Sequence, residues 1–299
     1  MLTLFQDNKK YIGYSIYCLL VTVMLLYFLF PDSLLPALLQ RIIKRADLPF
    51  DVIIEKAHLS SVAKVNIPYM RIVFKKEPYF LLEAQEAAFT PSLSSLLAGK
   101  IRCSFRALIY NGKVKGYFQL LEKKDKKIKI IASIKNIHID KQTYLQDILN
   151  RKISGKISGR FIYKCPVSKY WSGEGKGDFV WTDGVIKLRN NIPFLDRSFF
   201  FFNKMHIACK LKHKEVYLQD IKLKSKEFSG QFKGKINIKE GILKSSLDLD
   251  GKIRLSSYFR ERVSRNNTFI RKFLLSHCQN NYLNINIYGN IKEPRIRFL

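Results

Sequence analysis

Apolar and polar residues alternate along most of the chain after Phe50, and this period of two restricts the fold to β-strands. In the stretch 101–118, IRCSFRALIYNGKVKGYF, one side of the strand has Cys103, Phe105, Ala107 and Ile109, and the other has Arg102, Ser104 and Arg106. Asn111-Gly112 in the middle is a strong hairpin signal, because both residue types tolerate positive φ. Stretches of the same kind recur towards the C-terminus, separated by Pro, Gly and Asn. The sequence therefore predicts a mainly β protein.

The stretch 227–255 predicts a second hairpin. A two-residue turn at Glu240-Gly241 gives pairs that agree on both faces: Phe228 opposite Ile253, Phe232 opposite Leu249, Gly230 opposite Gly251, Lys233 opposite Asp248 and Glu227 opposite Arg254. A slip by one residue would move every side chain to the other face, so the face of each residue is well specified.

One face of the predicted strands is apolar along the chain. Its candidate groove residues are Phe105, Ile130, Phe161, Phe228, Phe232, Leu249 and Ile253. Helices are predicted at 91–98, 144–149 and 256–279. At about 1.5 Å rise per residue they are too short to cover a sheet of many strands. We therefore expect a long, curved antiparallel β-sheet with a few short helices and a partly open apolar groove.

The segment Tyr11–Phe30 has about 20 residues without a charge, enough to cross a bilayer as one helix. A cleaved signal peptide is the alternative, although no A-x-A-like site follows. Lys9 and Lys10 predict a cytoplasmic tail, whereas Arg41, Lys44 and Arg45 argue for the reverse orientation. The expected organisation is a tail at 1–10, a transmembrane helix at 11–30 and an exported, periplasmic β-rich domain at 31–299, held at the bacterial inner membrane.

Two further apolar stretches each allow two interpretations. Leu34 to Arg45 has helical spacing and basic residues, so it either packs under the first strands, which we favour, or lies on the bilayer. The run from Ile192 to Phe202 contains four consecutive Phe residues. We expect it in the core, with a membrane or partner contact as the alternative.

The chain is strongly basic, with Lys+Arg 53 against Asp+Glu 24 and a net charge of +29. Such an excess suits anionic lipid head groups or an acidic glycolipid, although lysines on the solvated faces of strands would also produce it. Placement outside the cytoplasm disfavours nucleic acid as a partner. A disulfide is possible in that compartment among Cys103, Cys165, Cys209 and Cys278.

No catalytic or cofactor motif is evident, and the sequence predicts a non-enzyme without cofactor or metal. The nearest metal-like group, His206, Cys209 and His213, lies on one predicted strand. There, the two His residues are an odd number apart and point to opposite faces. The glycine-rich run 173–177 is not followed by a helix or a Lys-Ser/Thr pair, so we interpret it as allowing close packing or a bend within a strand.

The order of these features resembles the type II secretion system protein N family. The likeness is carried by the basic tail, the span ending in Phe30-Pro31, Ser92-Leu93 with Leu96-Leu97 and Gly99-Lys100, and the Gly112/Gly116 hairpin after Phe105. This resemblance implies a bitopic inner-membrane protein with a β-rich periplasmic domain that assists protein secretion. More loosely, the chain is similar to AsmA-type proteins, whose elongated β-grooves are associated with lipid movement.

Two functions therefore compete. An accessory component of the type II secretion system would dock other secretion subunits through sheet edges and a basic face. A lipid-binding or lipid-transfer protein would instead hold phospholipid or anionic glycolipid on a continuous concave apolar face. We expect the first function and keep the second as the alternative.

Overall fold

The structure is a computed structural model of the chain, and the β-rich part forms one sheet. The residues described are 11, 13–19, 21–22, 24–25, 31, 33–45, 50–61, 64–74, 80–121, 127–142, 146, 151–166, 172–187, 199–239, 244–257, 259, 261, 272, 276–279 and 282–299.

In the described part of the chain, helices are short beside the strands. Those described from end to end are α2 (Leu34–Arg45), α3 (Leu93–Leu97) and the 3₁₀ turn η1 (Ile139–Lys141). The strands are β1 (Phe50–Ile54), β2 (His58–Ser61), β3 (Lys64–Phe74), β4 (Phe80–Pro91), β5 (Arg102–Ile109), β6 (Gly112–Leu120), β7 (Lys127–His138), β8 (Ile153–Pro166), β9 (Glu174–Lys187), β10 (Phe199–Lys212), β11 (Glu215–Lys224), β12 (Phe228–Asn237), β13 (Ser246–Leu255), β14 (Cys278–Gln279), β15 (Tyr282–Asn290) and β16 (Pro294–Phe298).

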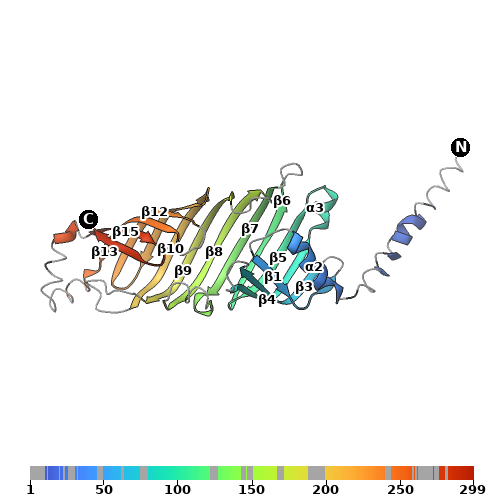
Figure 1. Cartoon of the computed structure of the whole chain (residues 1–299), viewed down its shortest axis with the longest axis horizontal. Helices are drawn as coiled ribbons and strands as arrows, with labels where there is room; N and C mark the ends of the chain where they lie inside the picture. Colours follow the sequence, from blue (N-terminus) through green and yellow to red (C-terminus); the bar gives the residue numbers. More distant parts are fainter. Residues whose placement is uncertain are drawn as a thin grey trace.

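All sixteen strands belong to a single antiparallel sheet (Figure 1). From β3 to β13 each strand pairs with the next one along the chain, so the sheet is a simple meander from the N-terminal to the C-terminal end. The predicted mainly β fold with a long antiparallel sheet is therefore confirmed.

The N-terminal end of the sheet is covered by α2, which begins and ends where the helical spacing predicts. Leu35, Leu39 and Ile43 face a core cluster with Ile54, Ile67 and Ala87 of the first strands. Gln40 Nε2 also donates a hydrogen bond to the carbonyl oxygen of Ile54, 3.0 Å away. The favoured interpretation, that this helix packs under the first strands, is confirmed.

The segment predicted to span the membrane is described only in part, and its described residues 11, 13–19, 21–22 and 24–25 are helical. Within the described residues, no helix has both the length and the apolar character needed to cross a bilayer.

The C-terminal end of the sheet has the larger core cluster. Phe202, Phe228, Leu255, Phe259 and Leu283 are buried there, and Leu283 has no exposed surface. Phe200 on β10 and Phe228 on β12 touch across the intervening β11, with ring centroids 5.1 Å apart. Strands that are not neighbours therefore share one core, which requires large rings on the same face of a twisted sheet.

The run of four Phe residues divides between core and surface. Phe202 is buried and Phe200 packs against the same cluster, whereas Phe201 is half exposed. The core interpretation is therefore correct for the alternate rings that face the cluster, while residues 192–198 lie outside the described part.

The register of the hairpin β12–β13 differs from the predicted one by two residues. Phe228 lies opposite Leu255, Phe232 opposite Gly251, and Gly230 opposite Ile253. Lys233 lies opposite Asp250 rather than Asp248, and Arg254 lies opposite Ser229 rather than Glu227. A shift of two keeps every residue on its predicted face. The observed register pairs large side chains with glycines, whereas the predicted one paired two glycines with each other.

Three local predictions were wrong in detail. Helix α3 is capped by Ser92, whose side chain accepts from the Ser95 amide, so it begins after Pro91 rather than at it. The dipeptide Asp183-Gly184 predicts a turn, because both residue types tolerate positive φ, but strand β9 continues through it. Cys278–Gln279 is a strand paired with β15 and not the end of a helix. The remaining predicted helical residues of 144–149 and 256–279 lie mostly outside the described part of the chain.

The corrected register makes a measurable prediction. A double-mutant cycle on Lys233 and Asp250 should give a favourable coupling of about 0.2 to 1 kcal/mol, because the two are direct cross-strand neighbours. The measurement is urea unfolding of the two single variants and the double variant. The same cycle on Lys233 and Asp248 serves as the control and should give a smaller coupling; the reverse order would restore the predicted register.

Candidate functional site

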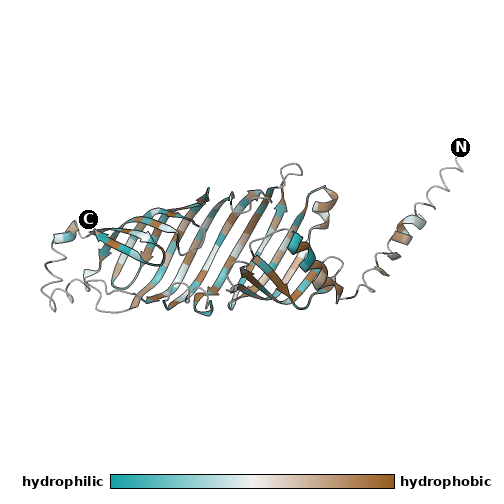
Figure 2. Cartoon of the chain, viewed as in Figure 1, coloured by the Kyte–Doolittle hydropathy of each residue, from teal (hydrophilic) through white to brown (hydrophobic). Residues whose placement is uncertain are grey.

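The candidate site is the apolar face of the sheet, which is continuous across its strands. Three neighbouring rows of directly paired residues run from β5 to β15, and every position in them is apolar, aromatic or glycine. The central row contains Phe105, Gly116, Ala132, Phe161, Gly177, Cys209, Leu218, Gly234, Leu249 and Ile287. Figure 2 shows the alternation of apolar and hydrophilic residues along the strands that produces these rows.

Aromatic rings lie against glycines of the neighbouring strands on this face. The ring of Phe105 touches the position that a Cβ would take at Gly116, and the ring of Phe179 does the same at Gly159 and Gly177. The ring of Phe232 fills the space above both Gly230 and Gly251. A side chain at these glycines would overlap the rings, so the glycines let the rings lie flat across the strands. The glycine-rich run 173–177 thus serves close packing, as the sequence predicts.

Both ends of the apolar face are covered by packed side chains, whereas the middle is less enclosed. The N-terminal end has the cluster under α2, and the C-terminal end has the cluster around Leu283. Between them, Phe118, Ile130, Ile134, Phe161 and Phe179 are only half-buried. Of the described helices, α2 packs against β1 and the three-residue turn η1 packs against β8. Large apolar side chains are therefore gathered there without being fully enclosed by the described residues.

The seven candidate groove residues all lie on this face, but in two environments. Phe105, Ile130, Phe161 and Leu249 are half-buried, the first three in the central strands. Phe228 and Ile253 are buried in the C-terminal cluster, and Phe232 packs against it. The face thus has a tightly packed end and a looser middle, which residue alternation alone does not distinguish.

Three cysteines point to the same face and are free. Cys103 and Cys165 are buried, Cys209 is half-buried, and none forms a disulfide. Burial raises the pKa of all three thiols above its ordinary value, which keeps them protonated at neutral pH. The possible disulfide is not present in this structure, and these residues act as small apolar members of the rows.

No cluster of His, Cys, Asp and Glu suited to a metal ion occurs among the described residues. His206 lies on the polar face, where its Nε2 is 3.1 Å from the Asp178 carboxylate. Cys209 lies on the opposite, apolar face, in the central row. The His206, Cys209 and His213 group therefore does not converge.

Sequence reasoning missed several residues of the apolar face. Tyr163, Phe179 and Trp181 contribute large rings to it, and Trp181 Nε1 donates to the Ser154 carbonyl oxygen at 3.1 Å, which satisfies its polar atom. The signal was available, because these three residues share the odd-numbered positions of their strands with Phe161 and Gly177.

Comparison of the chain with models of protein families, with curated proteins and with solved structures gave no match.

Proposed function

We propose that the chain binds lipid acyl chains along the apolar face of its sheet and guides them along its length, as a membrane-anchored lipid-binding or lipid-transfer protein. The observation that carries this proposal is the unbroken series of apolar rows from β5 to β15. Adjacent strands are about 4.8 Å apart, so the central row extends for about 43 Å, more than the hydrocarbon thickness of a bilayer.

The length of the apolar rows supports a binding surface, because a closed core does not require rows this long. A core is satisfied by two layers of side chains that bury one another, whereas the rings in the middle of this face are only half-buried by the described residues. Large contiguous apolar surfaces that remain accessible usually mark a binding site. Acyl chains suit a long, narrow and featureless apolar surface better than a compact ligand does.

The N-terminal end offers a route to a membrane. Helix α2 buries Leu35 and Leu39 against the sheet but exposes a second apolar stripe, in which Leu34, Leu38 and Ile42 are 57%, 47% and 56% exposed. Arg41, Lys44 and Arg45 are near this stripe, as in helices that lie at a lipid interface. With Tyr11–Phe30 as the anchor, the sheet would start at the inner membrane and extend into the periplasm.

The test is whether lipid is bound by the folded sheet. Full-length protein purified in mild detergent should carry phospholipid, measured by mass spectrometry of an organic extract. Most of this lipid should be released when urea unfolds the sheet, because the rows then no longer exist. Lipid that stays with the chain through unfolding would belong to the N-terminal segment, and protein whose lipid content is unchanged by unfolding would contradict the proposal.

Assembly with type II secretion subunits remains the second candidate, and one observation favours it. In the described part of the chain, β16 pairs with β15 alone, so the sheet keeps an edge at which a partner strand could add. An Ile296→Pro change should block such pairing and leave lipid content unchanged. If the chain acts in assembly, the Ile296→Pro change should reduce protein secretion, and unchanged secretion by this variant would reject the assembly function.

A further inference from the structure

We propose that the polar face of β5–β8, opposite the apolar rows, holds a site for a ligand with two or more phosphate groups. The site does not depend on the proposed lipid groove, because its charged side chains lie on the other side of the sheet, although Phe105 and Gly116 of the central row also line its pocket. This site explains part of the excess of Lys and Arg over Asp and Glu, which the lipid groove does not explain.

The charge on these four strands is entirely positive. They contain no Asp or Glu, and all their basic residues are on the polar face: Arg102, Arg106, Lys113, Lys115, Lys127, Lys129, Lys135, Lys156, Arg160 and Lys164. Several of these cations are direct cross-strand neighbours, such as Arg106 with Lys115 and Lys113 with Lys135. Like charges placed directly opposite each other are destabilising unless an anion lies between them.

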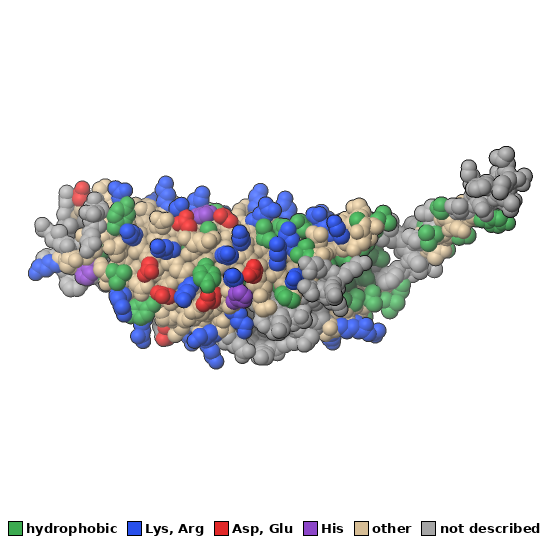
Figure 3. All heavy atoms as spheres, turned by 90° about the horizontal axis from the view of Figure 1, so that it is seen from above, with side chains coloured by type: hydrophobic (Ala, Val, Ile, Leu, Met, Phe, Trp, Pro, Cys, Tyr) green, Lys and Arg blue, Asp and Glu red, His purple; other side chains and the backbone are tan. Residues whose placement is uncertain are grey.

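The polar face of the following strands is different. There, Lys222 is 2.9 Å from Asp220, and Lys233 and Lys235 lie opposite Asp250 and Asp248. On the surface shown in Figure 3, acidic side chains lie among the basic ones towards the C-terminal end, and basic ones alone are seen nearer the N-terminal helix. General enrichment in lysine would not separate the acidic residues in this way.

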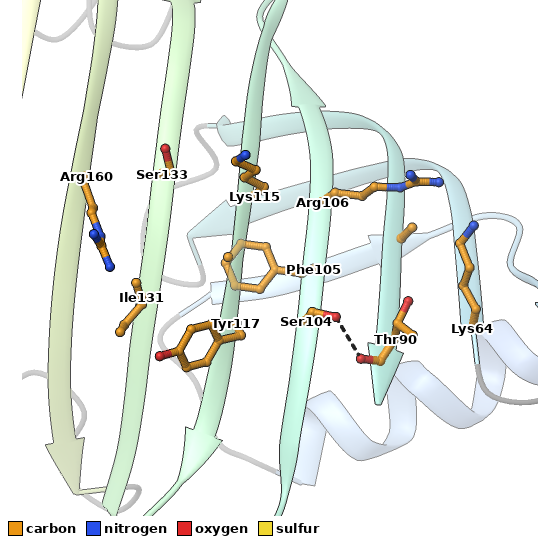
Figure 4. A pocket seen from close by; sticks show the side chains of 12 residues that line it. Lys64, Thr90, Ser104, Phe105, Arg106, Lys115, Tyr117, Ile131, Ser133 and Arg160 are labelled. Carbon is orange, nitrogen blue, oxygen red and sulfur yellow. Dashed lines mark hydrogen bonds between the residues drawn. The ribbon is translucent and has the colours of Figure 1, made fainter. Parts of the chain in front are cut away.

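A shallow pocket of about 700 Å³ lies within this basic surface. Lys64, Arg106, Lys115 and Arg160 line it, and no acidic residue does. The register explains the hollow, because the small Ala88 and Ser133 lie on either side of the long Arg106 and Lys115 in the row that continues to Arg160. Figure 4 shows the Arg106 side chain extending across β4 in the direction of Lys64.

The chemistry of the lining selects phosphate. Guanidinium groups bind phosphate through two parallel hydrogen bonds, and ammonium groups add point charges. The hydroxyls of Thr90 and Ser133 supply further donors, whereas Ser104 Oγ donates its one hydrogen to the Thr90 carbonyl oxygen, 3.1 Å away. The cations stand on several strands, so a ligand with separated phosphates would meet more of them than a single phosphate would.

The test compares two variants with equal loss of charge on the same face. Arg106→Gln/Lys115→Gln removes the centre of the site, and Lys233→Gln/Lys235→Gln is the matched control on β12. Full-length protein is titrated with pyrophosphate by calorimetry, and it is mixed with vesicles of phosphatidylglycerol or of phosphatidylcholine. The first variant should bind pyrophosphate about tenfold more weakly or worse, because it loses charge-assisted hydrogen bonds, while the control stays within about twofold of the wild type.

The vesicles identify the source of the phosphate. If the protein binds phosphatidylglycerol vesicles more strongly than phosphatidylcholine vesicles, and only the first variant loses this preference, the site is one for lipid head groups. If the protein binds pyrophosphate but neither kind of vesicle, the site is one for a soluble ligand. Equal affinities of the two variants, or a wild type that binds neither probe, would overturn the proposal. A single-stranded oligonucleotide that displaces pyrophosphate at much lower concentration would also overturn it, in favour of nucleic acid. Phe161→Asp should keep pyrophosphate binding, which separates this test from that of the groove.

Discussion

A Leu283→Asp variant is expected to lose about 4 to 5 kcal/mol or more of unfolding free energy, enough to unfold most of a marginally stable domain. Leu283 has no exposed surface and sits in the C-terminal cluster with Phe259, Phe228 and Ile285. A carboxylate there would be buried without a partner, and its neighbours cannot supply hydrogen bonds. The measurement is urea unfolding followed by circular dichroism.

The matched control for this variant is the next residue on the same strand. Asn284 is on the polar face, opposite Lys252, so Asn284→Asp adds the same charge at nearly the same place and should change stability by about 0.5 kcal/mol or less. If Leu283→Asp were as stable as the control, the C-terminal end of the sheet would not be a closed core, and the division of the apolar face into a packed end and a looser middle would fail.

Phe161→Asp is expected to keep the fold and to lower bound lipid by about tenfold or more, because a buried Phe contributes about 1.5 to 3 kcal/mol and a charge in an acyl-chain site adds a further cost. Phe161 is half-buried on β8, and its direct neighbours, Ala132 and Gly177, are small. Its replacement therefore leaves room for water around the carboxylate. Lipid per chain is measured by mass spectrometry, with urea unfolding run on the same sample.

The control here is Ile162→Asp, one residue further along β8 and on the polar face, where Lys176 lies directly opposite. It should leave both lipid content and fold intact. Unfolding of Phe161→Asp to the same degree as Leu283→Asp would mean that the middle of the sheet is an ordinary closed core. Unchanged lipid in a folded Phe161→Asp protein would place the lipid elsewhere.

Much of the fold could be predicted from the sequence because strand periodicity acts at short range. Alternation around Phe105 and Ile130 was sufficient to locate the strands and to assign side chains to faces, since the period of a strand is two. The bounds of α2 followed from helical spacing between Leu34 and Arg45.

The register of β12–β13 was not predictable in the same way. Shifts of two residues preserve both faces and produce equally reasonable charge pairs, such as Lys233 with either Asp248 or Asp250. The observed alignment seats the Phe232 ring over Gly230 and Gly251, a contact that appears only when side chains are placed in three dimensions. The bulges depend on the tertiary structure too, such as the one between Gln85 and Ala88, where Glu86 has φ of 49°.

The sequence predicted which residues share the apolar face, but it did not predict how their burial differs along that face. Phe228 and Phe161 are the same residue type on the same face of the sheet, yet one is buried in a cluster and the other is half-buried. What distinguishes them is the curl that brings β10, β12 and β15 together, and pairwise alternation does not specify it. The polar face of β5–β8 has only positive charges, and this could have been found from the sequence by assigning each Lys and Arg to one face of its strand.

The most direct test of lipid binding on the apolar face is site-specific photocrosslinking in cells. A benzophenone amino acid is placed in the full-length chain at Phe105, Phe161 or Leu249 on the apolar face, and at the nearby Leu108, Ile162 or Asp250 on the polar face. After irradiation, intact-mass spectrometry reads the adducts. The account predicts phospholipid adducts at all three apolar positions and none at the three polar ones. Absence of lipid adducts from the apolar positions, or equal lipid adducts on both faces, would contradict it.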